Sequence, residues 1–541
     1  MHFATILEGI SDRLGERDAL VHGSLRRSWR EYEQRAARLA GAFTEAGLAP
    51  GAKVGQYLYN GPEYLETGLA ALKQRMTPVN VNYRYVDAEL EYLLENSDCE
   101  ALVFDAALAE TVARVAPRLP GLRLCLQVGE GSPAPGAADY EEVLAASAPS
   151  PRCKRKPDDL FMMYTGGTTG MPKGVMYDLA DFTAGVGNMM PLVLFGRQPV
   201  ATDAEAIAYA QELDTEGKAP VFLPCSPLMH TAGLFQAMGA QLLGGRIVTL
   251  PERAFDPHAI WRAVSEEGVT AMVLVGDAFA RPLLDALQET NASGQRYELS
   301  ALRHIISSGV AWSSEVKQGL LECGDFVLVD GIGATEGAMG VQISQRGAAA
   351  SETARFLRLA DTKVFSEDGR EIEAGSDEVG LIAAGGILVP KGYYKDAEKS
   401  ARTFRKIGGK RYAFIGDWGR IDADGTLVFL GRGSGCINTA GEKVFPEEVE
   451  SFLKTHPEVE DCLVVGVADE RFGERVAAVV AARSPDRDLE AELLGWGKDE
   501  LAGYKRPRLI AQVERIPRAP NGKPDYKWAR KVATEHAGRA Q

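Results

Sequence analysis

The sequence predicts an α/β protein with a large N-terminal domain, built on mostly parallel βαβ sheets, and a small, mobile α+β C-terminal lid domain. Two observations predict this division. Short apolar runs alternate with segments of helical period through most of the 541 residues, which is typical of parallel sheets. Three glycines then fall within residues 431–435, and such a run makes a flexible joint. We therefore expect an N-terminal domain over residues 1–431, a hinge at 432–435 and a lid over 432–541.

The alternating pattern places the individual elements. Apolar runs predict strands, and amphipathic runs between them predict helices. The expected strands are 54–59, 78–81, 101–104, 246–250, 270–275, 304–307 and 326–329, with helices at 62–73, 86–94, 257–267, 279–288 and 313–322. The segment 196–220 is polar and weakly periodic, which predicts a surface insertion. After the joint, Pro446 opens a predicted helix, and strands are expected at 462–467 and 476–480.

The composition excludes several classes of protein. Hydrophobic residues make up 45% of the chain and charged residues 25%, as in an ordinary folded protein. The formal net charge is −15, so we expect no nucleic-acid partner. No stretch has the roughly 18 apolar residues of a membrane helix, and the first residues lack the order of a signal peptide. We therefore expect no integral membrane segment and a cytoplasmic location.

The strongest chemical signal is a run of glycines and threonines over residues 164–174, Y-T-G-G-T-T-G-M-P-K-G. Glycines allow backbone N–H groups to close on an anion, threonines add hydroxyl donors, and Lys173 adds a positive charge. This combination suits a triphosphate. It is not a Walker loop, because Lys173 lies between Pro172 and Gly174 and does not precede a Ser or Thr that opens a helix. A Gly/Thr-rich hairpin without a ligand is the alternative.

Further motifs, together with this loop, resemble the adenylate-forming (AMP-binding) superfamily and in particular its acyl-CoA synthetases. They recur in the family's order as P-L-M-H-T-A-G-L at 227–234, S-G-V-A at 308–311, G-A-T-E at 333–336, G-D at 416–417, G-R at 431–432 and P-N-G-K at 520–523. The resemblance spans nearly the whole chain. The stretches 276–287 and 522–529 also resemble a branch of bacterial ligases for long-chain fatty acids and steroid side-chain carboxylates.

The resemblance implies an ATP-dependent carboxylate:CoA ligase, an acyl-CoA synthetase that forms an acyl-AMP intermediate and uses ATP, Mg²⁺ and coenzyme A. Its expected substrate is an apolar carboxylic acid, either a long-chain fatty acid or a steroid side-chain acid, which places it in fatty acid or lipid metabolism. A homodimer is expected on the same ground. Two alternatives stay open: an acyl-adenylating enzyme that loads the phosphopantetheine of a carrier protein, and a non-catalytic nucleotide-binding protein of the same fold.

The resemblance also assigns roles to the residues around the phosphates. Thr335 is expected to bind a phosphate oxygen and Glu336 to bind Mg²⁺. Lys523 is expected to bridge the substrate carboxylate and the α-phosphate, because a cation there offsets the repulsion between two anions. The residues expected to hold the phosphates in the glycine-threonine run are Thr165, Gly166, Gly167, Thr168, Thr169, Gly170 and Lys173.

The remaining assignments concern the nucleoside, the acid and the thiol. Asp417 and Arg432 are expected to hold the ribose, and His230 to form a wall of the acyl site together with residues 182–195. Gly441 is expected to let the thiol arm of CoA approach the backbone. Taken singly, each of these residues has an ordinary alternative as a turn residue, a solvated charge or a core histidine. The residues expected around the adenine are Gly309, Val310, Ala311, Asp330, Gly331 and Ile332.

A hinged lid has a physical reason in this chemistry. A carboxylate is a poor acyl donor, so it is first activated as an acyl adenylate and then transferred to a thiol. The two steps need different groups over one site, which a rotating lid can supply. We expect Lys523 to lie on one face of the lid and residues 439–443 on the other.

Overall fold

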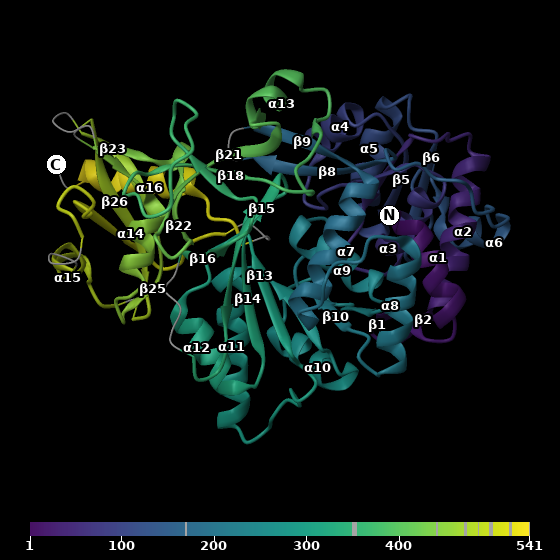
Figure 1. Cartoon of the computed structure of the whole chain (residues 1–541), viewed down its shortest axis with the longest axis horizontal. Coiled ribbons are helices and arrows are strands. Elements are labelled where there is room, and N and C mark those ends of the chain that lie inside the picture. Colours follow the sequence, from purple (N-terminus) through teal and green to yellow (C-terminus); the bar gives the residue numbers. More distant parts are fainter. Residues whose placement is uncertain are drawn as a thin grey trace.

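The computed structural model describes residues 1–167, 170–348, 354–439, 442–469, 473–484, 486–496, 501–518 and 522–539. A large mixed sheet runs through the N-terminal part of the molecule (Figure 1). Its strands are β1 (Asp18–His22), β2 (Leu25–Ser28), β10 (Val221–Pro224), β11 (Arg246–Thr249), β12 (Ala271–Leu274), β13 (His304–Ser308), β14 (Val327–Ala334), β15 (Gly337–Ser344), β16 (Arg355–Arg358), β17 (Lys363–Phe365), β18 (Gly380–Ala384), β20 (Phe404–Ile407), β21 (Lys410–Ile421) and β22 (Thr426–Arg432).

The large sheet is parallel in one half and antiparallel in the other. Its strand order is β17-β18-β21-β22-β16-β15-β14-β13-β12-β10-β11-β1-β2, with β20 beside β21. The strands from β11 to β14 pair in parallel, whereas β14, β15, β16 and β22 pair antiparallel. The parallel half brings the carboxyl ends of β12, β13 and β14 to one edge, where ligands bind in open α/β sheets.

Two smaller sheets complete the N-terminal part. A fully parallel sheet has the order β4-β3-β5-β6-β7, with β3 (Lys53–Tyr57), β4 (Thr77–Asn80), β5 (Cys99–Asp105), β6 (Leu124–Val128) and β7 (Ala138–Asp139). The other sheet is a hairpin of β8 (Leu160–Gly167) and β9 (Gly170–Asp178) with β19 (Gly392–Tyr393) alongside β9. The predicted α/β class with mostly parallel βαβ units is confirmed.

Helices cover these sheets, and five of them overlap the helices expected at 62–73, 86–94, 257–267, 279–288 and 313–322. They are α1 (Phe3–Leu14), α2 (Trp29–Glu45), α3 (Pro62–Lys73), α4 (Asp87–Asn96), α5 (Ala109–Val115), α6 (Tyr140–Ala146), α7 (Leu179–Phe195), α8 (Asp203–Thr215), α9 (Thr231–Leu242), α10 (Pro257–Glu267), α11 (Gly276–Ala292), α12 (Ser314–Cys323) and α13 (Ala397–Thr403). The bounds of α3 and α10 match the predicted helices. None of the described helices is both long and apolar enough to cross a membrane.

The polar segment 196–220, which was expected to be a surface insertion, is helical over much of its length. It contains α8, which begins with a capping box between Thr202 and Glu205 and packs against α1. Its buried side consists of Ala206, Tyr209, Ala210 and Leu213. Because two of these four residues are small alanines, the apolar period is weak in the sequence, and the helix was not predicted.

The C-terminal part of the chain forms a separate sheet with helices on both faces. After a 3₁₀ turn over Gly433–Gly435, its sheet has the order β24-β23-β26-β25, with β27 beside β26. One core lies under α14 and α15, and another lies under α16. Its elements are β23 (Ile437–Thr439), β24 (Glu442–Val444), α14 (Pro446–Leu453), β25 (Val459–Asp469), β26 (Gly473–Ala482), α15 (Glu490–Gly495), β27 (Leu509–Val513) and α16 (Tyr526–Arg539). We call residues 432–541 the lid.

Asn80, at the end of β4, joins two segments of the expected site. Its side-chain amide donates to the carbonyl oxygens of Tyr164 and Met229, at 2.8 and 2.7 Å. Its Oδ1 accepts from the backbone N–H of Tyr164 at 2.6 Å. The base of the β8–β9 hairpin and the segment that leads to α9 are therefore fixed to the parallel sheet by one buried side chain.

The N-terminal helix is anchored by a buried group of charges. Lys73, which is 1% exposed, donates to Glu8 at 2.7 Å and also contacts Glu33. Arg155 donates to both oxygens of Glu8, at 2.6 and 2.8 Å. Next to this group His2 is buried, and burial and then Arg155 lower the pKa of His2 to about 4. His2 therefore stays neutral in the folded protein at neutral pH.

We predict that His2 makes the protein acid-sensitive. The unfolded chain binds a proton at His2 below about pH 6.5, whereas the folded chain excludes it until about pH 4. Stability is therefore lost as the pH falls through this window, by about 2 kcal/mol at pH 5. His2→Asn should reduce the difference in Tm between pH 7 and pH 5. The half-exposed His258 supplies the control, and an equal effect of His258→Asn would contradict this account.

We predict that Asn80→Ala destabilises the protein by about 2–5 kcal/mol, because it leaves buried backbone groups without partners. Thermal unfolding measures this loss. Asn82→Ala is the control, because Asn82 makes one exposed bond to the N–H of Arg84. Equal Tm values for the two variants would contradict the bracing role of Asn80.

Candidate functional site

The expected phosphate loop is the tip of the β8–β9 hairpin. Thr165 and Lys173 face each other across the two strands, and Gly167 pairs with Gly170. Gly174 has no room for a side chain, because a Cβ atom there would lie 2.7 Å from Met162 Sδ. Thr168 and Thr169, which are also expected to hold the phosphates, lie outside the described residues. A hairpin tip, unlike a Walker loop, does not lead into a helix, as the position of Lys173 predicts.

Tyr393 on β19 connects Lys173 to Glu336. The Tyr393 hydroxyl donates to Glu336 Oε1 at 2.7 Å, and the Lys173 ammonium lies 5.3 Å from the centre of the Tyr393 ring. The sequence analysis missed Tyr393. The only signal for it in the sequence was the Gly-Tyr pair at 392–393, which is too short to interpret alone.

Thr335 is held by three segments of the fold. It follows the last residue of β14 and is buried. Its carbonyl oxygen accepts from the Tyr177 hydroxyl of β9, and its Oγ1 lies 3.0 Å from the Oγ1 of Thr231, the first residue of α9. The end of β14, the β8–β9 hairpin and α9 thus meet at one point.

His230 lies at this meeting point as the N-cap of α9. Burial, and then the positive charge of Lys523, lower the pKa of His230 to about 4. The imidazole is therefore neutral at pH 7. It can make hydrogen bonds there without adding a third positive charge to Lys523 and Arg432.

The expected ribose pair comes from two neighbouring antiparallel strands. Asp417 on β21 is opposite Arg432 on β22, and Arg432 Nε donates to Asp417 Oδ1 at 3.0 Å. Asp417 is 3% exposed. Burial raises the pKa of Asp417, and Arg432 opposes this effect. The pair is aligned by the β-sheet register, so two positions 15 residues apart become a single site.

Glu447, in the first turn of α14, packs against the end of β22. Its Oε1 accepts from the backbone N–H of Arg432 at 3.3 Å, and a Cβ atom on Gly431 would lie 2.1 Å from its other oxygen. Burial, and then the nearby Glu450, raise the pKa of Glu447 to about 8. The start of the lid is therefore in close contact with the last strand of the N-terminal part.

Lys523 reaches the site from the lid. Burial and then Arg432 lower the pKa of Lys523, whereas Glu336 opposes the shift. Lys523 thus interacts electrostatically with Arg432, Glu336 and His230, although part of its side chain remains open to solvent. The structure brings the lysine of the lid together with residues of β22, β14 and α9.

Arg518 holds the loop that carries Lys523. Its Nε and Nη2 donate to Asp461, both at 2.8 Å, and its Nη1 donates to the carbonyl oxygen of Gly522 at 3.1 Å. Gly522 has a φ of +70° and lies close to Val275 and Ala278, at the carboxyl end of β12. The sequence analysis missed Arg518 and Asp461, because they are distant in sequence and meet only in the folded lid.

A surface ion pair also joins the lid to the N-terminal part. Arg483, just after β26, lies 2.8 Å from Glu315 on α12. The hairpin β23–β24, in contrast, lies on the outer side of the lid in Figure 1. Gly441, the residue expected to contact the thiol, lies outside the described residues.

The residues expected around the adenine come from two adjacent strands. Ser308 on β13 pairs with Gly331 on β14, so residues 309–311 and 330–332 lie together. Gly309 has a φ of +92°, which favours glycine. Asp330 is buried, and its Oδ2 accepts from Lys317 Nζ at 2.7 Å. Burial raises the pKa of Asp330, and Lys317 opposes this effect. The role of Asp330 towards the adenine stays a prediction.

The expected acyl site lies beside an aromatic cluster. Phe161 stacks on Phe182 with ring centres 3.9 Å apart, and Phe235 of α9 packs edge-on against Phe182 at 4.8 Å. Gly239 lets α7 and α9 approach, because a Cβ atom there would lie 2.3 Å from Met190. Residues 182–195, which are expected at this site, thus belong to a helix that packs directly on α9, whose N-cap is His230.

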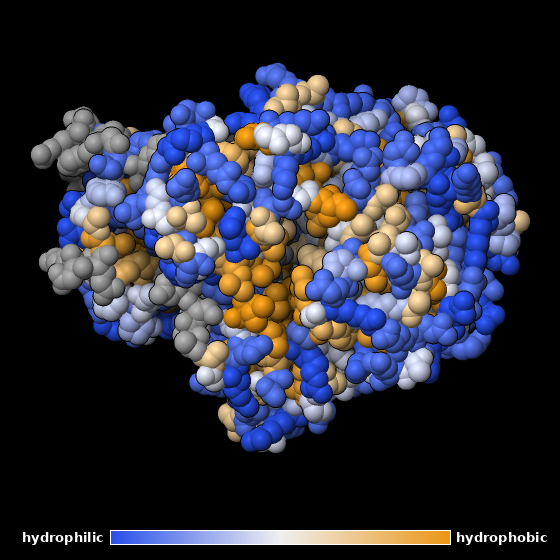
Figure 2. All heavy atoms as spheres, in the orientation of Figure 1, coloured by the Kyte–Doolittle hydropathy of each residue, from blue (hydrophilic) through white to orange (hydrophobic). Residues whose placement is uncertain are grey.

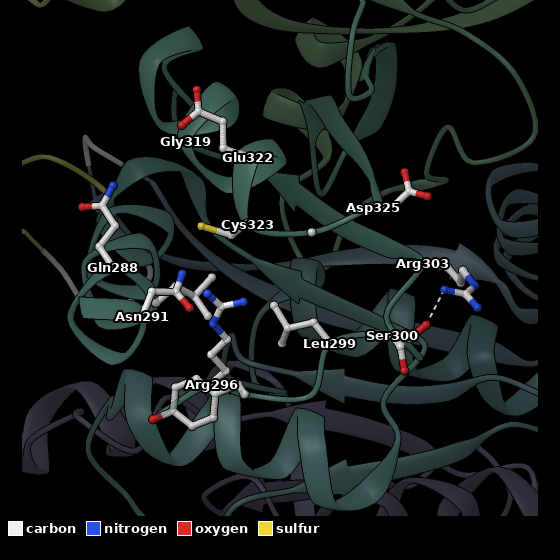
Figure 3. A pocket seen from close by; sticks show the side chains of 13 residues that line it. Gln288, Asn291, Arg296, Leu299, Ser300, Arg303, Gly319, Glu322, Cys323 and Asp325 are labelled. Atoms are coloured by element: carbon white, nitrogen blue, oxygen red, sulfur yellow. Dashed lines mark hydrogen bonds between the residues drawn. The ribbon is translucent and has the colours of Figure 1, made fainter. Parts of the chain in front are cut away.

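A surface pocket of about 870 Å³ lies elsewhere in the protein. Figure 3 shows Asn291 and Arg296 on one side of it and Cys323 of α12 on the other. Arg303, which also lines it, immediately precedes β13, whereas Gly309 follows the other end of this strand. Ligand sites of open parallel sheets lie at the carboxyl ends of the strands. We therefore do not assign this pocket to the site.

Comparisons with known proteins agree with the resemblance seen in the sequence. The model of the AMP-binding enzyme family matches residues 8–394, and that of the AMP-binding enzyme C-terminal domain matches residues 448–523. A solved structure of the anthranilate CoA ligase AuaEII in complex with anthranoyl-AMP has the same fold, with a TM-score of 0.85 and 22% identity. The similarity covers 99% of this chain and 98% of that chain.

Curated relatives are more similar in sequence. The 3-oxocholest-4-en-26-oate--CoA ligase of Rhodococcus rhodochrous is 39% identical over 98% of this chain and 95% of its own length. The medium/long-chain-fatty-acid--CoA/3-oxocholest-4-en-26-oate--CoA ligase of Mycolicibacterium smegmatis is 39% identical over 99% of this chain and 97% of its own length. These matches over nearly the full length confirm the resemblance, and the protein belongs to the AMP-binding enzyme family.

Proposed function

We propose that this protein is an ATP- and Mg²⁺-dependent carboxylate:CoA ligase that acts through an acyl-AMP intermediate. The observation that carries the proposal is the convergence of Lys523, Arg432, His230 and Glu336 from the lid and the N-terminal part. Two cations, Lys523 and Arg432, interact with each other near one carboxylate, Glu336. Such a group of charges suits a site for a polyanion. The relatives' names specify CoA, which favours CoA over a carrier protein as the acyl acceptor.

The first half-reaction joins two anions. A carboxylate oxygen of the acid attacks the α-phosphorus of ATP, the bond from that phosphorus to the α–β bridging oxygen breaks, and pyrophosphate leaves with the electron pair. Lys523 offsets the repulsion between the carboxylate and the α-phosphate in this proposal, which is supported by its electrostatic interactions with His230, expected at the acyl site, and Arg432, expected at the ribose.

Mg²⁺ would be held at Glu336. In ATP sites Mg²⁺ usually takes one or two carboxylates and completes its shell with phosphates and water, so a single glutamate beside Lys173 and Tyr393 fits this ion. When bound, Mg²⁺ neutralises phosphate charge. Tyr393 orients the carboxylate of Glu336 through the 2.7 Å hydrogen bond.

The second half-reaction needs another face of the lid. The sulfur of CoA attacks the acyl carbonyl, its proton is released, and AMP leaves with the electron pair of the acyl–oxygen bond. Lys523 is the lid residue that interacts with Arg432 and Glu336, whereas β23 lies on the outer side of the lid in Figure 1. Rotation about residues 432–435 would exchange them over the acyl adenylate.

We propose a large apolar acid as the substrate. The expected acyl site lies beside the aromatic cluster of Phe161, Phe182 and Phe235, and Figure 2 shows apolar side chains gathered over the middle of the large sheet. The relatives named above act on a steroid side-chain acid and on medium- and long-chain fatty acids. A homodimer and a cytoplasmic location are also proposed, the latter because ATP and CoA are cytoplasmic metabolites.

We predict that Lys523→Ala separates the half-reactions. Pyrophosphate release from ATP and the acid should fall by about 10²–10³-fold, because the cation at the forming bond is lost. Thioester formation from pre-made acyl-AMP should persist. The control is Lys527→Ala, which changes an exposed lysine of α16. Equal loss of both half-reactions would contradict the two-faced lid.

We predict that kcat/KM rises with the apolar surface of the acid. Each buried methylene contributes about 0.8 kcal/mol, or roughly fourfold, until the site is filled. ATP-dependent hydroxamate formation with fatty acids of increasing length, a steroid carboxylic acid, benzoate and malonate measures this trend. A preference for malonate would contradict an apolar acyl site, and no ATP consumption with any acid would contradict the ligase function.

A further inference from the structure

Lys399 and Lys173 face the same aromatic ring. The Lys399 ammonium lies 5.8 Å from the centre of the Tyr393 ring, and the Lys173 ammonium lies 5.3 Å from it. Lys399 is on α13, which begins three residues after β19 and lies near β9 in Figure 1. The strand hairpin and this short helix therefore bring two positive charges together.

The position of Lys399 is fixed by the backbone around it. Asp396 caps α13 by accepting from the Lys399 N–H at 3.0 Å, and the Ser400 hydroxyl accepts from the Tyr393 N–H at 2.8 Å. Tyr393 is fixed in turn by its bond to Glu336. The lysine thus belongs to a structured rim of the phosphate site.

The two ammonium groups repel each other, and the nearby carboxylates of Glu336 and Asp396 offset this repulsion only in part. Within the described part of the chain, no carboxylate forms an ion pair with either one. Two lysines close to Lys399 in sequence do form ion pairs: Lys391 pairs with Asp178 at 2.6 Å, and Lys395 pairs with Asp98 at 2.7 Å. Burial and then Lys399 lower the pKa of Lys173 to about 8. Such an arrangement is favourable when an anion lies between the cations.

The position along the triphosphate follows from which charged groups interact with each other. Asp417 and Arg432 mark the proposed ribose end, and Glu336 interacts electrostatically with both Asp417 and Lys173, whereas Asp417 is not among the groups that act on Lys173. The α-phosphate is next to the ribose, so the part of the triphosphate beyond Glu336 is the β,γ end. Lys173 and Lys399 lie at that end.

We propose that Lys399 is a second phosphate-binding lysine, which together with Lys173 holds the pyrophosphate end of ATP. This inference rests on the proposed function. When the α-phosphorus bond to the bridging oxygen breaks, the electron pair and its negative charge go to the pyrophosphate, and two lysines stabilise this charge. The residue therefore acts on the leaving group and on ATP, whereas AMP, which lacks these phosphates, does not reach it.

Equilibrium binding to the full-length protein tests this assignment. Isothermal titration calorimetry measures the affinities of Mg²⁺–pyrophosphate and of AMP for the wild type, Lys399→Gln and Lys399→Arg. A charge-assisted hydrogen bond corresponds to about a tenfold to hundredfold change in affinity. Lys399→Gln should weaken pyrophosphate binding by this factor and leave AMP binding unchanged, and Lys399→Arg should restore most of the affinity.

Lys395→Gln is the matched control, because Lys395 lies four residues away and already has a carboxylate partner. An unchanged pyrophosphate affinity in Lys399→Gln, or an equal loss of pyrophosphate and AMP affinity, would overturn the inference. The measurement uses neither acid nor CoA. A selective loss of pyrophosphate binding would therefore support the role of Lys399 even if no acid were activated, in which case only the proposed ligase function would fail.

Discussion

Repulsion between like charges is the constraint on which this site depends. Lys173 lies beside Lys399, and Lys523 lies beside Arg432, so in each pair one cation lowers the pKa of its neighbour. A folded protein tolerates such pairs only when packing and hydrogen bonds position the side chains strongly. A triphosphate brings further negative charge to both pairs, and binding it relieves the repulsion.

The surrounding structure serves to hold these charges in place. Asn80 fixes the hairpin of Lys173 to the parallel sheet, and the Tyr393–Glu336 bond fixes the carboxylate between the two pairs. On the lid, Arg518 ties the backbone of Gly522 to Asp461. All of these contacts are hydrogen bonds between buried or partly buried polar groups. Their geometry is specific, because a different arrangement would leave these groups without hydrogen-bond partners.

The sequence predicted much of the fold, and its motifs indicated a set of site residues of which several lie together in the structure. Periodicity placed α3 and α10 at their observed bounds, and the motifs indicated Lys173, Glu336, Asp417 and Lys523, which the structure brings to one region. The helix α8 was missed because its buried side contains small alanines. The antiparallel pairing from β15 to β22 was not predicted either, because short strands with exposed apolar residues lack a clear alternation.

The sequence by itself determined the element types, the joint between the two parts and the chemical kinds of side chain available, because these depend on local pattern and composition. Only the tertiary structure decided which side chains meet. Tyr393, Arg518 and Lys399 have ordinary sequence contexts, and they become part of the site because strand pairing and the docking of the lid bring distant residues within contact distance. Spatial proximity between distant segments is a property of packing, which local sequence does not encode.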